Sequence, residues 1–334
     1  MLNRVYFTVL LAVFLSVGQG VSAETWRLEK GQNWKAVSAE NDRYLLAVSE
    51  IKQLAGSGQT RALIKAFAEL KKDYPKLAGE DFDAFVKAEI LLSEGKFNKA
   101  GRAYEKFLAD YPESSLYEVV LDRQFSIATA FLGGQKRSVL KVFRIRGYST
   151  GASMMEKIAD RSGEGPLALK ATVLVAESLE KRGKFDEAYE KWSEVHSLWP
   201  EGQTGQGALL AMARCKHAGY RGTKYDISYL VSARSYYQNY KLKYPDDAER
   251  LNIAEKLEEI NEQLAYKQFG IAEYYKRSEN KQSANFYYRM VMEQWPGTKA
   301  AEMAQSAMEE KEPKIKKDEK WEKKVIKNLG EFFL

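Results

Sequence analysis

Apolar residues recur along this chain at steps of three and four, which is the spacing of one helix face. Five of these helical segments end in an aromatic residue followed by proline, and all five share one run-up. Leucine or alanine stands twelve residues before the proline; an aromatic residue follows four positions later and an apolar residue seven positions later. The endings are Tyr74-Pro75, Tyr111-Pro112, Trp199-Pro200, Tyr244-Pro245 and Trp295-Pro296. Since proline cannot continue a helix, each ending predicts a helix terminus.

Each of these segments is expected to be the second helix of an antiparallel pair. Alanines recur twelve positions upstream of the anchor residue, and glycines between them indicate short turns. The alanine pairs are Ala88 and Ala100, Ala176 and Ala188, and Ala272 and Ala284. Small residues at both positions would let the two helices approach closely where they cross.

A helix pair repeated about every 34 residues is typical of the tetratricopeptide repeat. Successive prolines lie 37, 88, 45 and 51 residues apart, so most copies carry insertions, and the longest interval has room for an extra pair near 115–132 and 152–161. A long helix is expected within 247–277, and a flexible turn at 202–207. The sequence therefore predicts an all-α, tetratricopeptide-repeat-type superhelical solenoid of about six helix pairs, a class that usually binds partners.

The two ends of the chain depart from the repeat. An apolar run at 5–17 and the small residues Val21-Ser22-Ala23 are the layout of a secretory signal, so we expect residues 1–23 to be a signal peptide. The cysteine that a lipid anchor would need is missing after this site. We therefore expect an exported solenoid over 24–310, periplasmic or outer-membrane-associated without a lipid anchor, and a charged amphipathic tail over 311–334.

Composition and motifs offer little chemistry. The 52 basic and 46 acidic residues leave a mild surplus that permits peripheral contact with a membrane or the cell wall and does not indicate nucleic acid. Two histidines and the single Cys215 form no metal-ligand spacing, and no phosphate-binding glycine motif is present. We expect no metal, no cofactor and no enzymatic activity, and a buried, inert thiol at Cys215.

The concave face of such a solenoid is lined by the first helix of each pair. The polar and aromatic residues that we expect there are Arg123, Gln124, Tyr274, Tyr275 and Arg277. Tyrosine and arginine are enriched at protein interfaces, which makes these residues candidates for partner binding.

A basic insertion over 136–148 is a second candidate. Arg144 and Arg146 lie in it among apolar residues and further basic ones, a composition suited to an anionic lipid, a wall polymer or an acidic partner. The alternative is a solvated surface loop that contacts the solenoid.

The tail is a third candidate. Trp321 lies at helical spacing with other apolar residues among many charges, and Phe332 and Phe333 follow near the terminus. Such a helix could dock on a membrane surface or in a partner's groove. The alternative is the polar capping helix that a solenoid requires at its end.

The C-terminal part resembles a known family. The stretches IAEYYKR at 271–277, SANFYYR at 283–289 and WPGTKA at 295–300 resemble the final repeat of the BamD/YfiO family, and the resemblance covers about 168–307. BamD is the outer-membrane lipoprotein of the β-barrel assembly machine. The resemblance implies the same fold and a role in outer-membrane β-barrel assembly, with barrel-assembly components or unfolded outer-membrane proteins as partners. The lipid-anchor cysteine is absent here, and the insertion has no counterpart.

Together these features predict a non-enzymatic scaffold or adaptor of the cell envelope that binds proteins through its repeats. One alternative is a periplasmic coordinator of cell-wall synthesis or of a secretion complex. A peptidoglycan-active enzyme is the alternative from another class.

Overall fold

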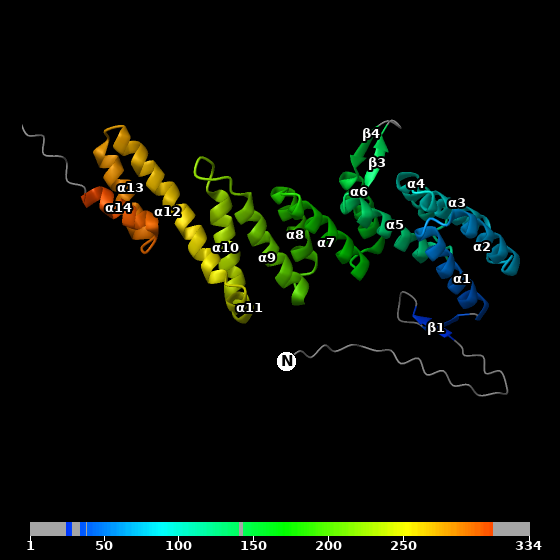
Figure 1. Ribbon diagram of the computed structural model, residues 1–334. Coiled ribbons are helices and arrows are strands. Elements are labelled where there is room, and N and C mark those ends of the chain that lie inside the picture. The colour runs from blue at the N-terminus through cyan, green and yellow to red at the C-terminus, as the bar shows by residue number, and fades with distance from the viewer. Residues whose placement is uncertain (1–24, 29–33, 38, 140–142, 310–334) are drawn as a thin grey trace, which may run out of the picture. The chain divides into compact units, whose positions relative to one another are not determined.

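The computed structural model describes residues 25–28, 34–37, 39–139 and 143–309, and in this part of the chain helices dominate (Figure 1). The predicted signal peptide at 1–23 and the tail at 311–334 lie outside the described residues. The chain divides into two compact units, one comprising residues up to Ile127 with Arg137–Ile145, the other Ala128–Lys136 with the residues from Arg146 onward.

The first unit is built from helix pairs behind a short hairpin. Its elements are β1 (Thr25–Leu28), β2 (Trp34–Val37), α1 (Ala39–Gly56), α2 (Thr60–Asp73), α3 (Glu80–Ser93), α4 (Phe97–Asp110) and most of α5 (Tyr117–Leu132). Strands β1 and β2 pair antiparallel, with Thr25 opposite Val37. Edge-to-face contacts of Phe67 with Phe82 and Phe85, at centroid distances of 5.7 and 6.0 Å, fill the core between α2 and α3.

The second unit continues the pattern from α6 to α14. Its helices are α6 (Tyr148–Ser162), α7 (Pro166–Lys181), α8 (Phe185–Leu198), α9 (Gly202–Gly219), α10 (Ser228–Lys243), α11 (Pro245–Arg250), α12 (Ile253–Arg277), α13 (Lys281–Gln294) and α14 (Lys299–Glu309). Most helices pack on the one that follows, and α10 packs on α12 as well as on the short α11 (Figure 1). The fold is the predicted tetratricopeptide-repeat-type helical solenoid; its continuity as one body over 24–310 stays a prediction.

The repeated sequence pattern has a direct structural cause. The anchor residues Leu63, Ala100, Ala188, Ala233 and Ala284 are all buried, and so are the aromatic residues four positions later. Each aromatic residue before a proline is the C-cap of its helix, with φ between −134° and −129°, outside the helical region that a following proline disfavours. In all five, the cap N–H donates to the carbonyl of the apolar residue seven positions after the anchor.

Two helices lie in the interval where the extra pair was predicted, and the insertion between them contains strands. Helices α5 and α6 occupy the interval where a sixth pair was predicted. Between them the basic insertion forms a two-stranded sheet, β3 (Lys136–Val139) and β4 (Phe143–Arg146), where a loop was the alternative.

Two details of the prediction were wrong. Residues 202–207 form the first turns of α9 rather than a flexible turn. The long helix begins only at Ile253, because Asn252 adopts a left-handed φ of 52° that separates α11 from α12.

A buried ion cluster, which we call the α3–α5 clamp, joins three successive helices of the first unit. Glu89 of α3 is fully buried and accepts hydrogen bonds from Tyr104 of α4 at 2.5 Å and from the Nε and Nη2 groups on one edge of the Arg123 guanidinium of α5, each at 2.8 Å. Arg123 also donates to the backbone oxygen of Lys52 at 2.7 Å. Burial, and next the charge of Glu89, raise the pKa of Tyr104 well above its usual range, so the phenol stays a donor.

A second clamp of the same kind, the α7–α9 clamp, occurs in the other unit. Glu180 of α7 accepts from Trp192 of α8 at 3.1 Å and from Arg214 of α9 at 2.9 and 3.1 Å. In both clamps the glutamate and the arginine lie 34 residues apart, the length of one repeat. The α7–α9 clamp is more open, since the side chain of Arg214 is 47% exposed and that of Arg123 only 11%.

We expect Gly205→Ala to destabilise the second unit by about 1–3 kcal/mol, because the added methyl group would lie 1.8 Å from the backbone oxygen of Pro200. Gly207→Ala, two residues later in α9, is the matched control: its methyl group meets nothing within 4 Å. Glycine within a helix costs about 0.5–1 kcal/mol relative to alanine, so the control should be stabilised. Urea unfolding followed by circular dichroism measures both, and equal effects would contradict the predicted clash.

We expect Arg123→Met to destabilise its surroundings by about 3–5 kcal/mol, because it leaves the buried Glu89 carboxylate without its counter-charge. Arg214→Met should cost only about 0–1 kcal/mol, since that ion pair is partly solvated. Hydrogen exchange at the amides of α3 and α7 measures the local stability around each clamp. Exchange at α3 that is no faster than in the unmodified chain would exclude the proposed role of Arg123.

Candidate partner-binding surfaces

Two of the residues expected in the groove are occupied in packing. Arg123 is held in the α3–α5 clamp, and Gln124, of which 1% is exposed, donates to Glu105 at 2.5 Å. Neither side chain offers a free surface in this structure. The signal for Arg123 was present in the sequence, because Glu89 precedes it by one repeat length.

Aromatic side chains form a continuous group on the last helix pair, which we call the aromatic ladder. Its members are Tyr274 and Tyr275 of α12 and Phe286 and Tyr287 of α13. Tyr275 and Tyr287 stack at 5.5 Å with an interplanar angle of 8°, and Tyr274 and Phe286 each meet the adjacent ring edge-on, at 5.5 and 5.4 Å. The ladder thus extends over both helices of the pair.

The outer members of the ladder are open to solvent. Tyr274 is 58% and Phe286 59% exposed, while Tyr275 and Tyr287 pack against the buried core below. Arg277 is also exposed and lies in the last turn of α12. The structure thus groups the expected Tyr274 and Tyr275 with two residues of α13 that the sequence analysis did not select.

The basic insertion places a second group of side chains at its base. Arg144 and Arg146 lie in β4, and Arg146 donates to the hydroxyl of Tyr148 at 2.6 Å. From the start of the α7–α8 turn, the guanidinium of Arg182 lies over the ring of Tyr148, 4.5 Å from its centroid. The insertion is therefore tied to the helix pair that follows it.

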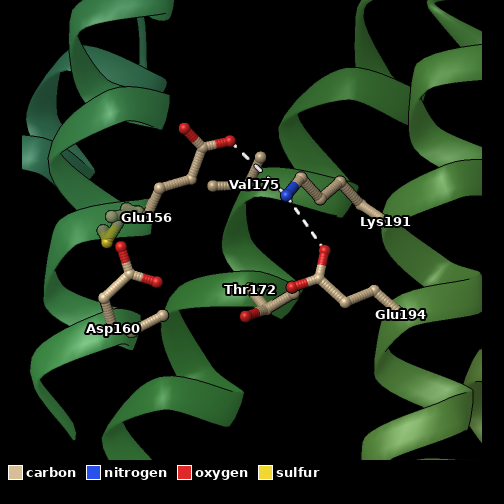
Figure 2. Close-up of a pocket in the computed structure, with 8 residues that line it drawn as sticks. Glu156, Asp160, Thr172, Val175, Lys191 and Glu194 are labelled. Atoms are coloured by element: carbon tan, nitrogen blue, oxygen red, sulfur yellow. Dashed lines mark hydrogen bonds and ion pairs between the residues drawn. The ribbon is translucent and has the colours of Figure 1, made fainter. Parts of the chain in front are cut away.

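A pocket of about 300 Å³ is lined by α6, α7 and α8 (Figure 2). Lys191 of α8 points into it toward two carboxylates, Glu194 at 2.9 Å and Glu156 of α6 at 3.4 Å, with Asp160 nearby (Figure 2). The hydroxyl of Thr172 of α7, which also lines the pocket, donates to the backbone oxygen of Ala168.

The lysine in this pocket is held in its charged form. Burial alone would lower the pKa of Lys191, but the hydrogen bond and charge of Glu194, together with Glu156, outweigh it and raise the pKa. A charged amine cannot take up a proton or attack a carbonyl. The arrangement links α6 to α8 electrostatically.

The residues that could bear other chemistry also have structural partners. His196 bonds the backbone oxygen of Gly205 at 3.1 Å, and His217 bonds Gln263 at 3.2 Å. Cys215 is 1% exposed, and burial raises the pKa of its thiol to about 12, as expected of an inert cysteine. Throughout the described residues, no group of three or more histidine, cysteine or acidic side chains is placed to hold a metal ion.

The remaining candidates, Trp321, Phe332 and Phe333, lie outside the described residues. Within 39–139 and 143–309, none of the helices combines the length and apolar character that crossing a membrane requires.

Comparisons with known proteins give two family matches. The model of a family described as outer membrane lipoprotein, YfiO, matches residues 147–327, more than half of the chain. A tetratricopeptide-repeat model matches residues 85–114, which include most of α3 and all of α4. A comparison with curated proteins gives no match.

Two similar solved structures are both distant. MamA from AMB-1 is 15% identical, with 53% of this chain and 82% of that chain covered and a TM-score of 0.30. The C-terminal part of a TPR repeat-containing protein from Cytophaga hutchinsonii is 16% identical, with 79% and 95% covered and a TM-score of 0.32.

We expect the folded chain to lose stability between about pH 9 and pH 12. Burial raises the pKa of Cys215 and of Tyr237 to about 12, above their ordinary values, so the folded state favours the neutral forms. The contribution of these two neutral groups to the free energy of unfolding is fully present below their pKa values in the unfolded chain. It disappears as the pH rises through their pKa values in the folded chain. The urea midpoint should hold from pH 7 to about 9 and fall above it.

The tyrosinate absorbance at 295 nm provides the accompanying measurement. In urea the tyrosines should titrate together near pH 10, whereas the folded chain should show a late phase that coincides with loss of the helical signal. A single phase near pH 10 without unfolding would contradict the burial of Tyr237 and Tyr104.

Proposed function

The chain belongs to the YfiO family of outer membrane lipoproteins, and from this premise we propose that it is a non-enzymatic scaffold in the assembly of outer-membrane β-barrel proteins. Both family matches and the fold support a tetratricopeptide-repeat scaffold for protein interaction. The family match spans the helices from α6 to α14 and therefore includes the aromatic ladder.

The aromatic ladder is the observation that supports this function. Exposed apolar residues that occur singly are normal on a protein surface, whereas a contiguous group of rings indicates an interaction site. Here Tyr274 and Phe286 are more than half exposed and continuous with the Tyr275–Tyr287 stack. Tyrosine and phenylalanine are enriched at the centres of protein interfaces.

The ladder is also suited to tight binding because part of it is already ordered. Tyr275 and Tyr287 rest on the buried cluster around Ala272, Ala284 and Tyr288. A side chain that is immobilised before binding loses little conformational entropy when the partner arrives. The outer rings would then contribute contact area, with Arg277 beside them as a polar residue.

A coordinator of cell-wall synthesis or of a secretion complex is the second candidate function. It would use the same ladder with a different partner, so the identity of the bound proteins distinguishes the two. Barrel-assembly components and unfolded outer-membrane proteins are the partners that the proposed function requires.

We predict that Tyr274→Ala/Phe286→Ala lowers affinity for the partner by roughly thirtyfold or more, since a hot-spot ring contributes about 2 kcal/mol or more. The measurement is crosslinking of the tagged chain in cells, mass spectrometry of the captured proteins, and then titration of the identified partner. Tyr225→Ala/Leu242→Ala is the matched control, because it removes two exposed apolar side chains that lie outside the ladder.

Three outcomes decide the proposal. Capture of barrel-assembly components that is lost in the ladder variant and kept in the control supports it. Capture of cell-wall enzymes or secretion components alone would favour the second candidate function, with the ladder as its binding surface. Equal capture by the ladder variant and the unmodified chain, with both folded by circular dichroism, would rule out the ladder as the binding surface.

A further inference from the structure

Two arginines share one tyrosine ring at the base of the basic insertion. Arg182 lies 4.5 Å and Arg146 5.8 Å from the centroid of the Tyr148 ring, and Arg146 also bonds the hydroxyl of that ring. The Nε of Arg182 donates to the backbone oxygen of Ser178 at 2.9 Å, which fixes the guanidinium in place. Two like charges are thus held around a single side chain.

A third cation lies opposite Arg146 on the neighbouring strand. The N–H of Gly147 donates to the backbone oxygen of Gln135 at 2.9 Å, and this register places Lys136 of β3 opposite Arg146 of β4. Both side chains are exposed. Like charges that lie directly opposite in a strand pair are destabilising, so packing does not account for this arrangement.

None of these three cations forms an ion pair in the described part of the chain. The contacts of Arg146 and Arg182 there are the tyrosine ring, its hydroxyl and a backbone oxygen. The charge of Arg182 still reaches Glu187: the pKa of that carboxyl is lowered chiefly by its hydrogen bond with Lys184 and to a lesser extent by Arg182. By contrast, Arg123 and Arg214 are each paired with a glutamate. We call Lys136, Arg146, Tyr148 and Arg182 the hairpin-base cluster.

The cluster is also braced to keep its geometry. A methyl group at Gly147 would lie 2.3 Å from the ring of Phe131, so the backbone approaches α5 closely just before Tyr148. Gly134, with a φ of 98°, likewise lies against the Tyr148 hydroxyl. Close packing therefore surrounds Tyr148 and the residue before it, while Arg182 is held separately by its bond to Ser178.

We propose that the hairpin-base cluster binds a phosphate group. The planar, permanently charged guanidinium offers paired N–H donors that match phosphate oxygens, and stacking on an aromatic ring orients it. A phosphate bound between Arg146 and Arg182, with Lys136 at its edge, would offset the repulsion among the three cations. The phosphate of an anionic lipid head group and a free phosphate ion share this chemistry, and the two arms of the test separate them.

This site is independent of the aromatic ladder. It lies on β3, β4, α6 and the end of α7, whereas the ladder lies on α12 and α13. A lipid phosphate bound here would hold the scaffold at a membrane surface while the ladder binds proteins. Failure of either proposal leaves the other standing.

In the first arm, the purified full chain is mixed with phosphatidylcholine vesicles, with and without phosphatidylglycerol, at low ionic strength and then floated on a density gradient. We expect binding only to the anionic vesicles, and roughly a thirtyfold loss for Arg146→Gln/Arg182→Gln, because each basic residue near such a surface contributes about fivefold. Lys65→Gln/Lys106→Gln removes the same charge from two exposed lysines on α2 and α4 and should cost much less.

In the second arm, inorganic phosphate is titrated calorimetrically into the same proteins. Arg146→Gln alone accompanies the double variant, because Arg146 is exposed and its removal should leave the fold intact by circular dichroism. Arg146→Lys/Arg182→Lys keeps the charge but loses the planar donors, so we expect it to bind less than the unmodified chain and more than the glutamine variant.

Each outcome has one meaning. One outcome is vesicle binding that is lost in Arg146→Gln/Arg182→Gln and kept in the control Lys65→Gln/Lys106→Gln. This result supports the site with a lipid phosphate as ligand. Binding of inorganic phosphate alone, with the same dependence, supports the site with a soluble ligand. Two results would overturn the proposal. One is the absence of binding in both arms, and the other is an equal loss of vesicle binding in Lys65→Gln/Lys106→Gln.

Discussion

The close crossing of two helices at alanine is the constraint on which the rest of this structure depends. Ala88 and Ala100, Ala176 and Ala188, and Ala272 and Ala284 are all buried, and each pair is separated by twelve residues. No side chain longer than a methyl group lies at the crossing, so the two helices can approach closely there. This close approach fixes the distance between the other side chains of the pair. The aromatic ladder lies on the same pair of helices as Ala272 and Ala284, with Tyr275 of α12 stacked on Tyr287 of α13.

The polar interior of the repeats follows the same geometry. In the α3–α5 clamp and the α7–α9 clamp, an acid on the first helix reaches an aromatic donor on the second and an arginine on the next first helix. Burial determines how much each ion pair contributes to stability. The side chain of Glu180 is 22% exposed, so it depends less on its arginine than the fully buried Glu89 does. The apolar crossing thus sets the distance between the two helices of a pair. The ion clusters link each of these pairs to the first helix of the next.

The period and endings of the helices could be predicted from sequence because they depend on local rules, the 3.6-residue face and the proline stop. The burial of Arg123 could not be predicted, because it depends on contact with Glu89 in another helix, although the 34-residue spacing between the two carried a hint.

Strands β3 and β4 were missed because each has only four residues. Residues 202–207 were misjudged because Gly205 serves a close approach to Pro200 within a helix rather than a turn. Phe286 and Tyr287 were not selected because their contacts with Tyr274 and Tyr275 depend on how α12 and α13 pack together.

The clamps also give the array of helices a chemical direction. Each complete clamp needs an acid on one pair and an arginine one repeat later, so exchanging two pairs would leave a carboxylate and a guanidinium both without partners. In the last pair Glu273 bonds Tyr288 as Glu89 bonds Tyr104, but the position one repeat beyond Glu273 is Ala307 of α14. Among the described helices, this third acid–aromatic pair therefore has no arginine one repeat later to complete a clamp. Recombination among such repeats in evolution would be restricted to cuts that keep acid and arginine in order.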